Sequence, residues 1–352
     1  MLYQTENQHG GDVYGGDITL DFSANTNPLG TPPGVLEAVR RGLPQLHRYP
    51  DPYCRRLVQA IAGHEQVPAS YILCGNGAAD LIYTYCAALR PRTAVELAPT
   101  FVEYGAGLAQ VGCRVERYFL HQAQNFDLDE RFLSFLEEKK PEVVFLCNPN
   151  NPTGRLIPLP LLEQILQYCA AQGARLFLDE CFLDLTEDGV SAKSLLAAHP
   201  ALLLLKAFTK SYGMAGLRLG YCLCADSALL RDMAAASPPW NVSSLAQSAG
   251  VAALEEGEFL RRTVELVRKE RSYLAGELTA LGFRVCPSQA NYLLLHGAAG
   301  LREKLLQRGI AIRGCGNYHG LDEGWYRVAV RSHGENEALI AAIRQLCREG
   351  QL

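Results

Sequence analysis

The chain has 352 residues, of which 48% are hydrophobic and 20% charged, and its formal net charge at pH 7 is −4. This composition is typical of a water-soluble protein, and the length allows one large domain with a smaller one. The slight acidic excess argues against a nucleic-acid surface, which needs clustered positive charge. No apolar run reaches membrane-spanning length, and the N-terminus lacks the basic and apolar regions of a signal peptide. We therefore expect a cytoplasmic protein without nucleic-acid or membrane partners.

Twelve cysteines and eight histidines raise the question of disulfides or a metal site. The cysteines are scattered through apolar segments and form no CxxC pair, so we expect reduced thiols in the core. The histidines show no HExxH motif or other ligand spacing, and no metal site is expected.

Residues 1–33 are predicted to form an extended arm. This stretch is dense in glycine, asparagine and proline, which indicates irregular backbone around one short strand at 19–22. It includes the long loop SANTNPLG at 23–30, and an ordered loop of this length is usually functional.

Residues 34–240 are predicted to form a large α/β domain. Near-continuous apolar strands that alternate with helices indicate a mostly parallel sheet covered by helices on both faces. Ligands bind such sheets at the carboxyl ends of the strands. Strands are expected at 71–74, 93–97, 115–119, 142–147, 175–179 and 202–206, and helices at 33–42, 53–64, 78–89, 101–111, 129–139 and 159–171.

Residues 241–352 are predicted to form a smaller α+β domain, because strands and helices are mixed in this part of the sequence. A long helical region at 243–281 is expected to link the two domains. The other elements are strands expected at 283–286, 291–295, 311–313 and 325–330 and helices at 300–308 and 335–349.

The clearest chemical signal is the segment LLLLKAFTKSYGMAGLRLGY at 202–221. A lysine at the mouth of a buried strand and near another cation has a lowered pKa, so Lys210 could act as an amine nucleophile. Arg218, on a second short strand expected at 217–221, could hold a phosphate together with Thr209 or Ser211. One covalent bond and one anion clamp are the parts of an anchor for pyridoxal phosphate (PLP). For a short Thr-Lys-Ser match alone, solvated lysines and a surface arginine would be the better interpretation.

Two further loops follow predicted strands. In CGNGAAD at 74–80, glycines let backbone amides approach a phosphate at a helix N-terminus. Gly75 and Gly77 also form half of a dinucleotide fingerprint, with Glu96 about 20 residues on. Asp80 replaces the third glycine, however, and nothing else in the chain supports NAD. In CNPNNPTG at 147–154, an asparagine amide could bond a ring hydroxyl.

Acidic and basic residues at other strand ends fit the same interpretation. Asp179 ends the strand RLFLD, and a carboxylate there could bond a protonated pyridine nitrogen, although it could also be only a helix cap. Arg313 and Arg327 sit at strand ends of the smaller domain with the loop GCGNYHG between them. As a pair facing a cleft they suit an anionic substrate, because guanidinium groups bind carboxylate or phosphate bidentately.

The string T-K-x-x-G-x-x-G-L-R-L-G at 209–220 resembles the lysine segment of fold-type I PLP enzymes, the aminotransferase superfamily. The resemblance covers nearly the whole chain and implies an aspartate-aminotransferase-like fold with PLP as cofactor. It implies that Lys210 is the Schiff-base lysine and Asp179 the partner of the pyridine nitrogen. Tyr49 resembles the tyrosine that reaches the neighbouring subunit's cofactor, which implies a homodimer with shared sites. The other cofactor contacts implied by the resemblance are Gly77, Ala78, Phe101, Asn151, Thr209 and Arg218.

Within that superfamily the chain is similar to both histidinol-phosphate aminotransferases and the threonine-phosphate decarboxylases of the cobalamin pathway. HGG at 9–11, the arm sequence LDFSANTNPLG at 20–30 and YRVAVR at 326–331 match the decarboxylases better. Phe182, in DECF, stands where aminotransferases usually carry a tyrosine. The substrate-binding residues that the resemblance implies are His9, Asn25, Asn151, Arg313 and Arg327.

The implied reaction is decarboxylation of L-threonine O-3-phosphate to (R)-1-amino-2-propanol O-2-phosphate in cobalamin biosynthesis. Serine phosphate, which differs from this substrate by one methyl group, is an alternative substrate. The alternative reaction is transamination of histidinol phosphate or a related amine with glutamate and 2-oxoglutarate. A non-catalytic PLP-binding regulator is a further alternative, although a fused DNA-binding segment would have no room before residue 30.

Overall fold

The computed structural model describes residues 9–351. Its largest feature is a seven-stranded sheet with the order β2-β8-β7-β6-β5-β3-β4. The strands β3 to β7 pair in parallel, whereas β8 runs antiparallel to both β7 and β2. The strands are β2 (Ile72–Gly75), β3 (Thr93–Ala98), β4 (Arg114–Phe119), β5 (Val143–Cys147), β6 (Arg175–Asp179), β7 (Leu202–Ala207) and β8 (Gly220–Cys224). The predicted mostly parallel α/β sheet is therefore confirmed.

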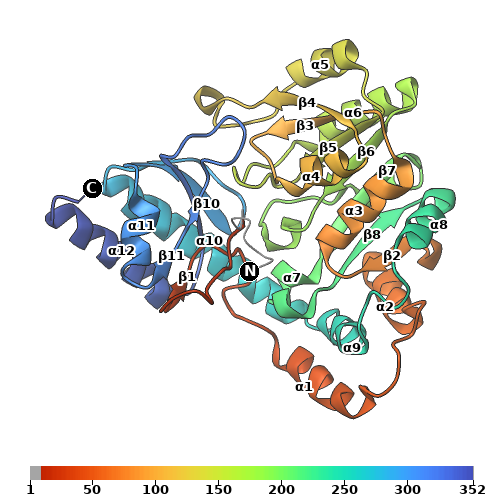
Figure 1. Cartoon of the computed structure of the whole chain (residues 1–352), viewed down its shortest axis with the longest axis horizontal. Coiled ribbons are helices and arrows are strands. Elements are labelled where there is room, and N and C mark those ends of the chain that lie inside the picture. The colour runs from red at the N-terminus through yellow and green to blue at the C-terminus, as the bar shows by residue number, and fades with distance from the viewer. Residues whose placement is uncertain (1–8, 352) are drawn as a thin grey trace.

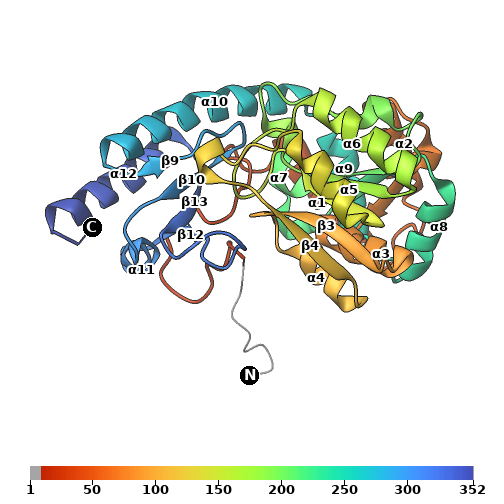
Figure 2. The same cartoon turned by 90° about the horizontal axis from the view of Figure 1, so that it is seen from above.

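Helices cover both faces of this sheet, as Figure 2 shows. On one face lie α3 (Ala78–Leu89), α4 (Glu103–Gln110) and α8 (Ser227–Ala236). On the other lie α2 (Arg55–Glu65), α5 (Arg131–Lys139), α6 (Leu159–Gln172) and α9 (Ser244–Ala253), with α1 (Pro33–Gly42) packed on α9. Short 3₁₀ turns occur at Leu43–Gln45 (η1), Ala69–Tyr71 (η2), Gln122–Gln124 (η3), Leu183–Leu185 (η4), Ala192–Leu195 (η5) and Ala215–Leu217 (η6).

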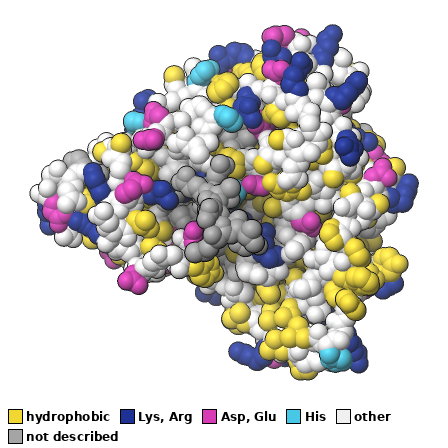
Figure 3. All heavy atoms as spheres, in the orientation of Figure 1, with side chains coloured by type: hydrophobic (Ala, Val, Ile, Leu, Met, Phe, Trp, Pro, Cys, Tyr) yellow, Lys and Arg dark blue, Asp and Glu magenta, His cyan; other side chains and the backbone are white. Residues whose placement is uncertain are grey.

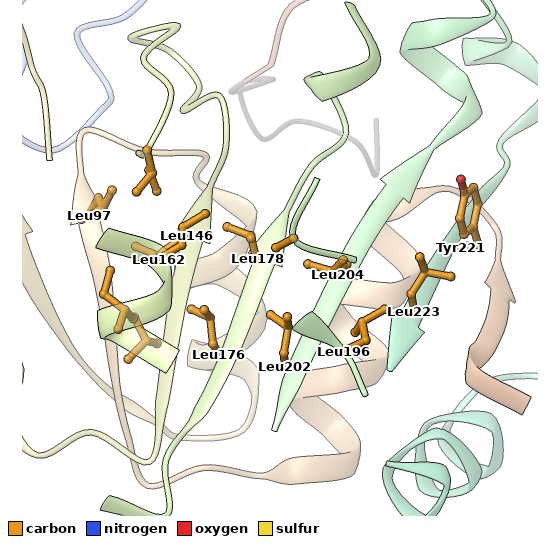
Figure 4. Packing of buried hydrophobic residues seen from close by; sticks show 14 of the residues in the cluster. Leu97, Leu146, Leu162, Leu176, Leu178, Leu196, Leu202, Leu204, Tyr221 and Leu223 are labelled. Atoms are coloured by element: carbon orange, nitrogen blue, oxygen red, sulfur yellow. The ribbon is translucent and has the colours of Figure 1, made fainter. Parts of the chain in front are cut away.

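The central strand β7 begins with four leucines, Leu202 to Leu205, because both of its faces are covered. Side chains alternate along a strand, so Leu202 and Leu204 pack under α2 and α6 while Leu203 and Leu205 pack under α3 and α8. Figure 4 shows Leu202 next to Leu176 and Leu204 next to Leu178 of β6, with Leu223 of β8 on the other side. Because both faces are covered, an unbroken leucine run is the sequence that this strand requires.

A second, four-stranded sheet has the order β12-β13-β10-β9 and is antiparallel throughout. Its strands are β9 (Arg284–Val285), β10 (Tyr292–His296), β12 (Arg313–Gly314) and β13 (Trp325–Ala329), and its helices are α10 (Gly257–Ala280), α11 (Leu301–Leu306) and α12 (His333–Arg348). The arm joins this part of the molecule, because β1 (Leu20–Asp21) pairs in parallel with β11 (Ile310–Ala311). In Figure 1 the arm runs between the two sheets, close to the four-residue helix α7 (Phe208–Ser211).

Several predicted elements were wrong in detail. The helical region at 243–281 is two helices, because the chain leaves the helical conformation at Glu256, whose side chain accepts a hydrogen bond from the Gly34 amide. The strand expected at 217–221 begins only at Gly220. Arg218, with φ +57°, precedes that strand in the left-handed region. The strand expected at 311–313 is divided between β11 and β12, and α8 had not been expected.

The described residues also bear on cysteines, metals and membranes. The twelve cysteines are free thiols, and ten of them are buried, in agreement with the expectation of core thiols. Between residues 9 and 351 there is no group of three or more His, Cys, Asp or Glu that could hold a metal ion. Within the same range, no helix is both long enough and apolar enough to cross a bilayer.

Candidate active site

Lys210 lies at the carboxyl end of β7, in the first turn that follows this strand. Its side chain is partly buried, with Nζ 5.8 Å from the centre of the Phe182 ring. Loss of hydration, together with the positive charges of Arg327 and Arg218, lowers the pKa of Lys210 to about 8. A substantial fraction of the amine is then neutral near physiological pH, as a nucleophile requires. The sequence prediction of a lysine with a lowered pKa agrees with this environment.

Asp179 is the last residue of β6, one strand away from β7, and its side chain is buried. Its Oδ2 accepts a hydrogen bond from the Tyr104 hydroxyl at 2.6 Å, and its Oδ1 accepts one from the Cys181 amide at 2.8 Å. Burial raises the pKa of Asp179 in spite of these bonds. Such a carboxylate gains from a cationic N–H partner, which a protonated pyridine nitrogen would provide.

Gly77, Ala78 and Arg218 lie together at the start of α3. Gly77 has φ +85°, and a Cβ at this position would lie 2.6 Å from Nη2 of Arg218. The guanidinium group therefore packs directly over the turn. Gly220, at the start of β8, lets that strand approach equally closely, because a Cβ there would lie 2.8 Å from the Ala78 nitrogen. Amides at a helix N-terminus beside an arginine suit a phosphate.

Other predicted cofactor residues surround this position. Thr209 is buried in α7, next to Lys210. Phe101 follows β3 and meets Tyr104 edge-on, with ring centres 5.6 Å apart. Asn151 is buried in the loop after β5, and its Oδ1 accepts a 2.5 Å hydrogen bond from Nη1 of Arg327. The loops that carry these residues come from separate strands but meet at one edge of the sheet.

Arg313 and Arg327 are direct partners across β12 and β13. The prediction that both sit at strand ends was wrong for Arg327, which is the central residue of β13. This placement buries Arg327, whose Nη2 donates to the Ser23 carbonyl at 2.8 Å. Arg313 is partly buried against Tyr318, and its Nη2 donates to Asn317 at 2.7 Å.

Several buried polar atoms beside Arg327 have no hydrogen-bond partner within the described part of the chain. They are Nδ2 and Oδ1 of Asn25, Oδ1 of Asn291 and Nε of Arg327. Asn291 also donates through Nδ2 to the Asn25 carbonyl at 3.2 Å, so these two asparagines are adjacent. Buried polar groups are nearly always paired in proteins, and a small cluster of unpaired ones indicates a place for a polar ligand. Sequence reasoning missed Asn291, which was only the first residue of an expected strand.

His9 lies beside Phe101, with ring centres 6.0 Å apart. Its Nε2 is 2.8 Å from Oε1 of Glu103, and the other Glu103 oxygen accepts a 2.6 Å hydrogen bond from Tyr83. His9 and Arg313 line one cavity of about 800 Å³ between the arm and the second sheet. Two predicted substrate-binding residues from opposite ends of the chain therefore share a cavity. Glu103 and Tyr83 carry no motif that could have revealed this contact.

Tyr49 is set apart from these residues. Its side chain is 80% exposed and packs against Trp240, with ring centres 4.7 Å apart. Figure 3 shows hydrophobic side chains gathered in the lower part of the molecule, over α1 and the neighbouring helices. Large hydrophobic side chains exposed along α1, the loop after it and nearby are Leu36, Leu43, Leu46, Tyr49, Tyr53 and Trp240. We refer to these six residues as the apolar patch.

The arrangement of a lysine with a lowered pKa, a buried carboxylate and an arginine packed over a glycine turn can be compared with known proteins. Residues 17–344 match the family model for aminotransferase class I and II. The chain belongs to this family. A threonine-phosphate decarboxylase from Salmonella typhimurium is 41% identical over 94% of this chain and 92% of that protein.

Solved structures agree with this assignment. A histidinol-phosphate aminotransferase from Clostridium acetobutylicum superposes with a TM-score of 0.87 at 28% identity, covering 94% of this chain and 99% of the other. An L-threonine-O-3-phosphate decarboxylase from Porphyromonas gingivalis superposes with a TM-score of 0.83 at 25% identity, with the same coverage. The aspartate-aminotransferase-like fold expected from the sequence is thereby confirmed.

Proposed function

We propose that the protein is a PLP-dependent decarboxylase that converts L-threonine O-3-phosphate to (R)-1-amino-2-propanol O-2-phosphate and CO₂. The observation that carries the reaction class is Lys210, an amine with a pKa of about 8 between the Asp179 carboxylate and the Arg218 cradle. The 41% identity to the Salmonella typhimurium decarboxylase favours decarboxylation and this substrate.

The residues present fit PLP. The turn at Gly77 and Ala78, with Arg218 over it and Thr209 buried nearby, suits the phosphate group. Phe101 and Asn151 would face the ring and its oxygen, and Asp179 and Lys210 would hold the pyridine nitrogen and the aldehyde carbon. When bound, PLP supplies an electron sink for the electron pair left on Cα when a bond there breaks.

The substrate would be held at two anionic ends. Arg327, with unpaired polar atoms of Asn25 and Asn291 beside it, offers a site close to Asn151 and Lys210. Arg313 and His9 line the neighbouring cavity and offer a second site. Holding both ends fixes which Cα bond is aligned for cleavage, and we propose that the bond to the carboxylate carbon is the one selected. Loss of CO₂ leaves a carbon that needs one proton, and Lys210 can donate it because its pKa is near the working pH.

A direct assay separates this reaction from transamination, which the similarity to the Clostridium acetobutylicum enzyme favours as the second candidate. PLP-loaded protein is incubated with L-threonine O-3-phosphate in the absence of any 2-oxo acid. Stoichiometric CO₂ and an amine phosphate are expected. Absence of CO₂, with glutamate formed from 2-oxoglutarate when histidinol phosphate is supplied, would establish the aminotransferase instead. Serine phosphate tested in parallel measures the contribution of the substrate methyl group.

We also propose a homodimer in which Tyr49 of one subunit reaches the cofactor of the other. The apolar patch supports this, since exposed hydrophobic clusters of this kind usually mark an interface. Light scattering should give a dimer for the wild type and a monomer for Leu46→Glu. A monomeric wild type would contradict the shared site.

Further parts of the proposal are a cytoplasmic location, a role in cobalamin biosynthesis, and the division of the chain into an arm (1–33), a large domain (34–240) and a small domain (241–352).

A further inference from the structure

A cluster of buried charges lies behind Lys210, on the face of the sheet covered by α2. At its centre, Lys206 places Nζ 2.9 Å from Oδ1 of Asp184 and 3.3 Å from Oε1 of Glu65. The side chain of Lys206 is 6% exposed and that of Glu65 is 2% exposed. Lys206 belongs to β7, Asp184 to η4 and Glu65 to the end of α2, so the cluster ties three elements together.

The charges of Lys206 and Glu65 are stable near neutral pH. Although burial alone would lower it, the carboxylates of Asp184 and Glu65 hold the pKa of Lys206 above its ordinary value. Against the opposing effect of burial, Lys206 lowers the pKa of Glu65 to about 2. Glu65 also accepts hydrogen bonds from the Tyr221 hydroxyl at 2.5 Å and from Lys193 at 2.9 Å. The ion pair between Lys206 and Glu65 therefore persists near neutral pH.

The cluster reaches the residue next to Lys210. The second oxygen of Asp184, Oδ2, lies 3.3 Å from Oγ of Ser211 and accepts its hydrogen bond. From the other side, the arm residue Asn27 donates through Nδ2 to the Ser211 carbonyl at 2.7 Å and through its backbone amide to the Lys210 carbonyl at 3.1 Å. Lys210 thus sits in a backbone turn that is held on one side by Asp184 and on the other by the arm.

This external support matters because α7 has only four residues. So short a helix cannot fix its own geometry, since one turn closes too few hydrogen bonds to offset its ordering entropy. A buried ion pair is also costly to desolvate, and a well-packed apolar side chain at position 206 would often be no less stable. What the charges add is orientation, because Lys206 binds Oδ1 of Asp184 and so leaves Oδ2 to accept the hydrogen bond from Ser211.

We propose that Asp184, oriented by Lys206, is a positioning residue for Lys210. The ion pair with Lys206 fixes the orientation of the Asp184 carboxylate, and this carboxylate accepts the hydrogen bond from Ser211. The α7 turn, held in this way, then places the Lys210 amine where cofactor and substrate must meet. Lys206 and Asp184 act on Lys210 through Ser211, and neither has a direct role in the proposed reaction. This inference rests on the proposed function of Lys210 and adds residues that orient it.

The test compares variants at each step of this chain of contacts. Ser211→Ala removes the bond to the turn with minimal change in volume, and Asp184→Asn removes the charge while keeping the shape. Lys206→Met removes the orienting cation, and Lys206→Arg restores a cation. Lys193→Met is the control, because Lys193 donates a hydrogen bond to Glu65 from the partly exposed edge of the cluster. Asp184, the partner of Ser211, is bound instead by Lys206.

Three quantities are measured on each full-length protein. The first is kcat and KM for CO₂ release by the PLP-loaded enzyme. The second is the fraction of chains on which borohydride fixes the cofactor covalently at Lys210, without substrate. The third is the melting temperature of the cofactor-free protein. We expect Ser211→Ala and Asp184→Asn to lower kcat by about tenfold with KM changed less than about twofold, and to lower the trapped fraction. Lys206→Met should do the same, and Lys206→Arg should recover most of the loss.

The outcomes separate the possible failures. Wild-type kinetics and trapping in both Ser211→Ala and Asp184→Asn would overturn the positioning role. Losses that follow the melting temperature alone, with Lys193→Met affected to the same degree, would overturn it as well, because they would reflect general stability. If Lys206→Met does not fold, Ser211→Ala and Asp184→Asn still decide the question. A wild type that itself traps no cofactor at Lys210 would instead refute the proposed function.

Discussion

Arg313 and Arg327 face each other directly across two paired strands, although 14 positions of sequence separate them. Two guanidinium groups on adjacent strands repel each other unless anionic groups lie between or beside them. Burial is the largest cause that lowers the pKa of Arg313 and of Lys210, and the positive charge of Arg327 lowers both further. The pair is therefore suited to a substrate with two anionic ends, and the two arginines are expected to differ in what they recognise.

Substitution of each arginine should reveal this difference. Arg327→Ala should reduce kcat/KM by about a hundredfold for both threonine phosphate and threonine, since it also leaves the buried Asn151 amide oxygen without its donor. Arg313→Ala should lose activity mainly toward the phosphorylated substrate and so erase the preference for it. Equal loss by both variants on both substrates would contradict separate roles.

The contact between His9 and Glu103 gives a prediction about the arm. Glu103→Gln replaces the carboxylate that holds His9, so KM for the phosphorylated substrate should rise by about three- to tenfold while kcat changes little. Tyr83→Phe is the matched variant, because it removes only the bond to the far oxygen of Glu103 and should have a smaller effect. An unchanged KM in Glu103→Gln would show that His9 does not assist substrate binding.

The turn at Gly77 should be intolerant of a side chain. Gly77→Ala introduces a Cβ 2.6 Å from Arg218 at a backbone φ of +85°, so we expect cofactor affinity to fall by at least about tenfold. Gly276→Ala is the control, because a Cβ at this helical position meets open space and should stabilise α10 by up to about 1 kcal/mol. Cofactor affinity is measured by titration of the cofactor-free protein. Equal affinities in the two variants would argue against a phosphate cradle at this turn.

The lowered pKa of Lys210 predicts how stability depends on pH. In the cofactor-free protein, Lys210 titrates near pH 8, and in the unfolded chain it titrates at its ordinary value near 10.5. Between these values the unfolded state binds one more proton, so the free energy of unfolding rises with pH in this interval. Below pH 8 the buried ammonium costs up to about 3 kcal/mol, which Lys210→Met should recover.

Urea unfolding of the cofactor-free wild type and Lys210→Met at several pH values measures this effect. The advantage of Lys210→Met is expected to be largest at pH 7 and to disappear by about pH 10.5. A stability difference that stays constant over the whole range would mean that the pKa of Lys210 is not lowered.

The order of strands and helices could be predicted from the sequence because each element carries its own pattern. The leucine run of β7 requires two covered faces, and that pattern is local. The position of Arg218 could not be predicted in this way, because its left-handed conformation depends on β8 starting at Gly220 against the Ala78 amide. The sequence LRLG at 217–220 has the composition of a strand, but β8 begins only at its last residue, Gly220.

The contacts of the site depend on residues that are far apart in the sequence. The sequence around Lys206 is also compatible with a solvated loop lysine. Lys206 can be buried because it pairs with Glu65, which is 141 positions away in the sequence. Glu103 meets His9 only when the arm crosses between the two sheets. Roles for Lys210 and Asp179 could be proposed from the sequence because motifs point to them, whereas the side chains that contact their surroundings are brought in by the fold.

The most direct test of the account is to locate the cofactor. Purified protein is loaded with PLP, reduced with borohydride without substrate, digested and analysed by mass spectrometry. The account predicts that one lysine, Lys210, carries the added mass, with Lys206 unmodified because its amine is buried and paired with Asp184 and Glu65. Modification at another lysine, or none, would contradict the account.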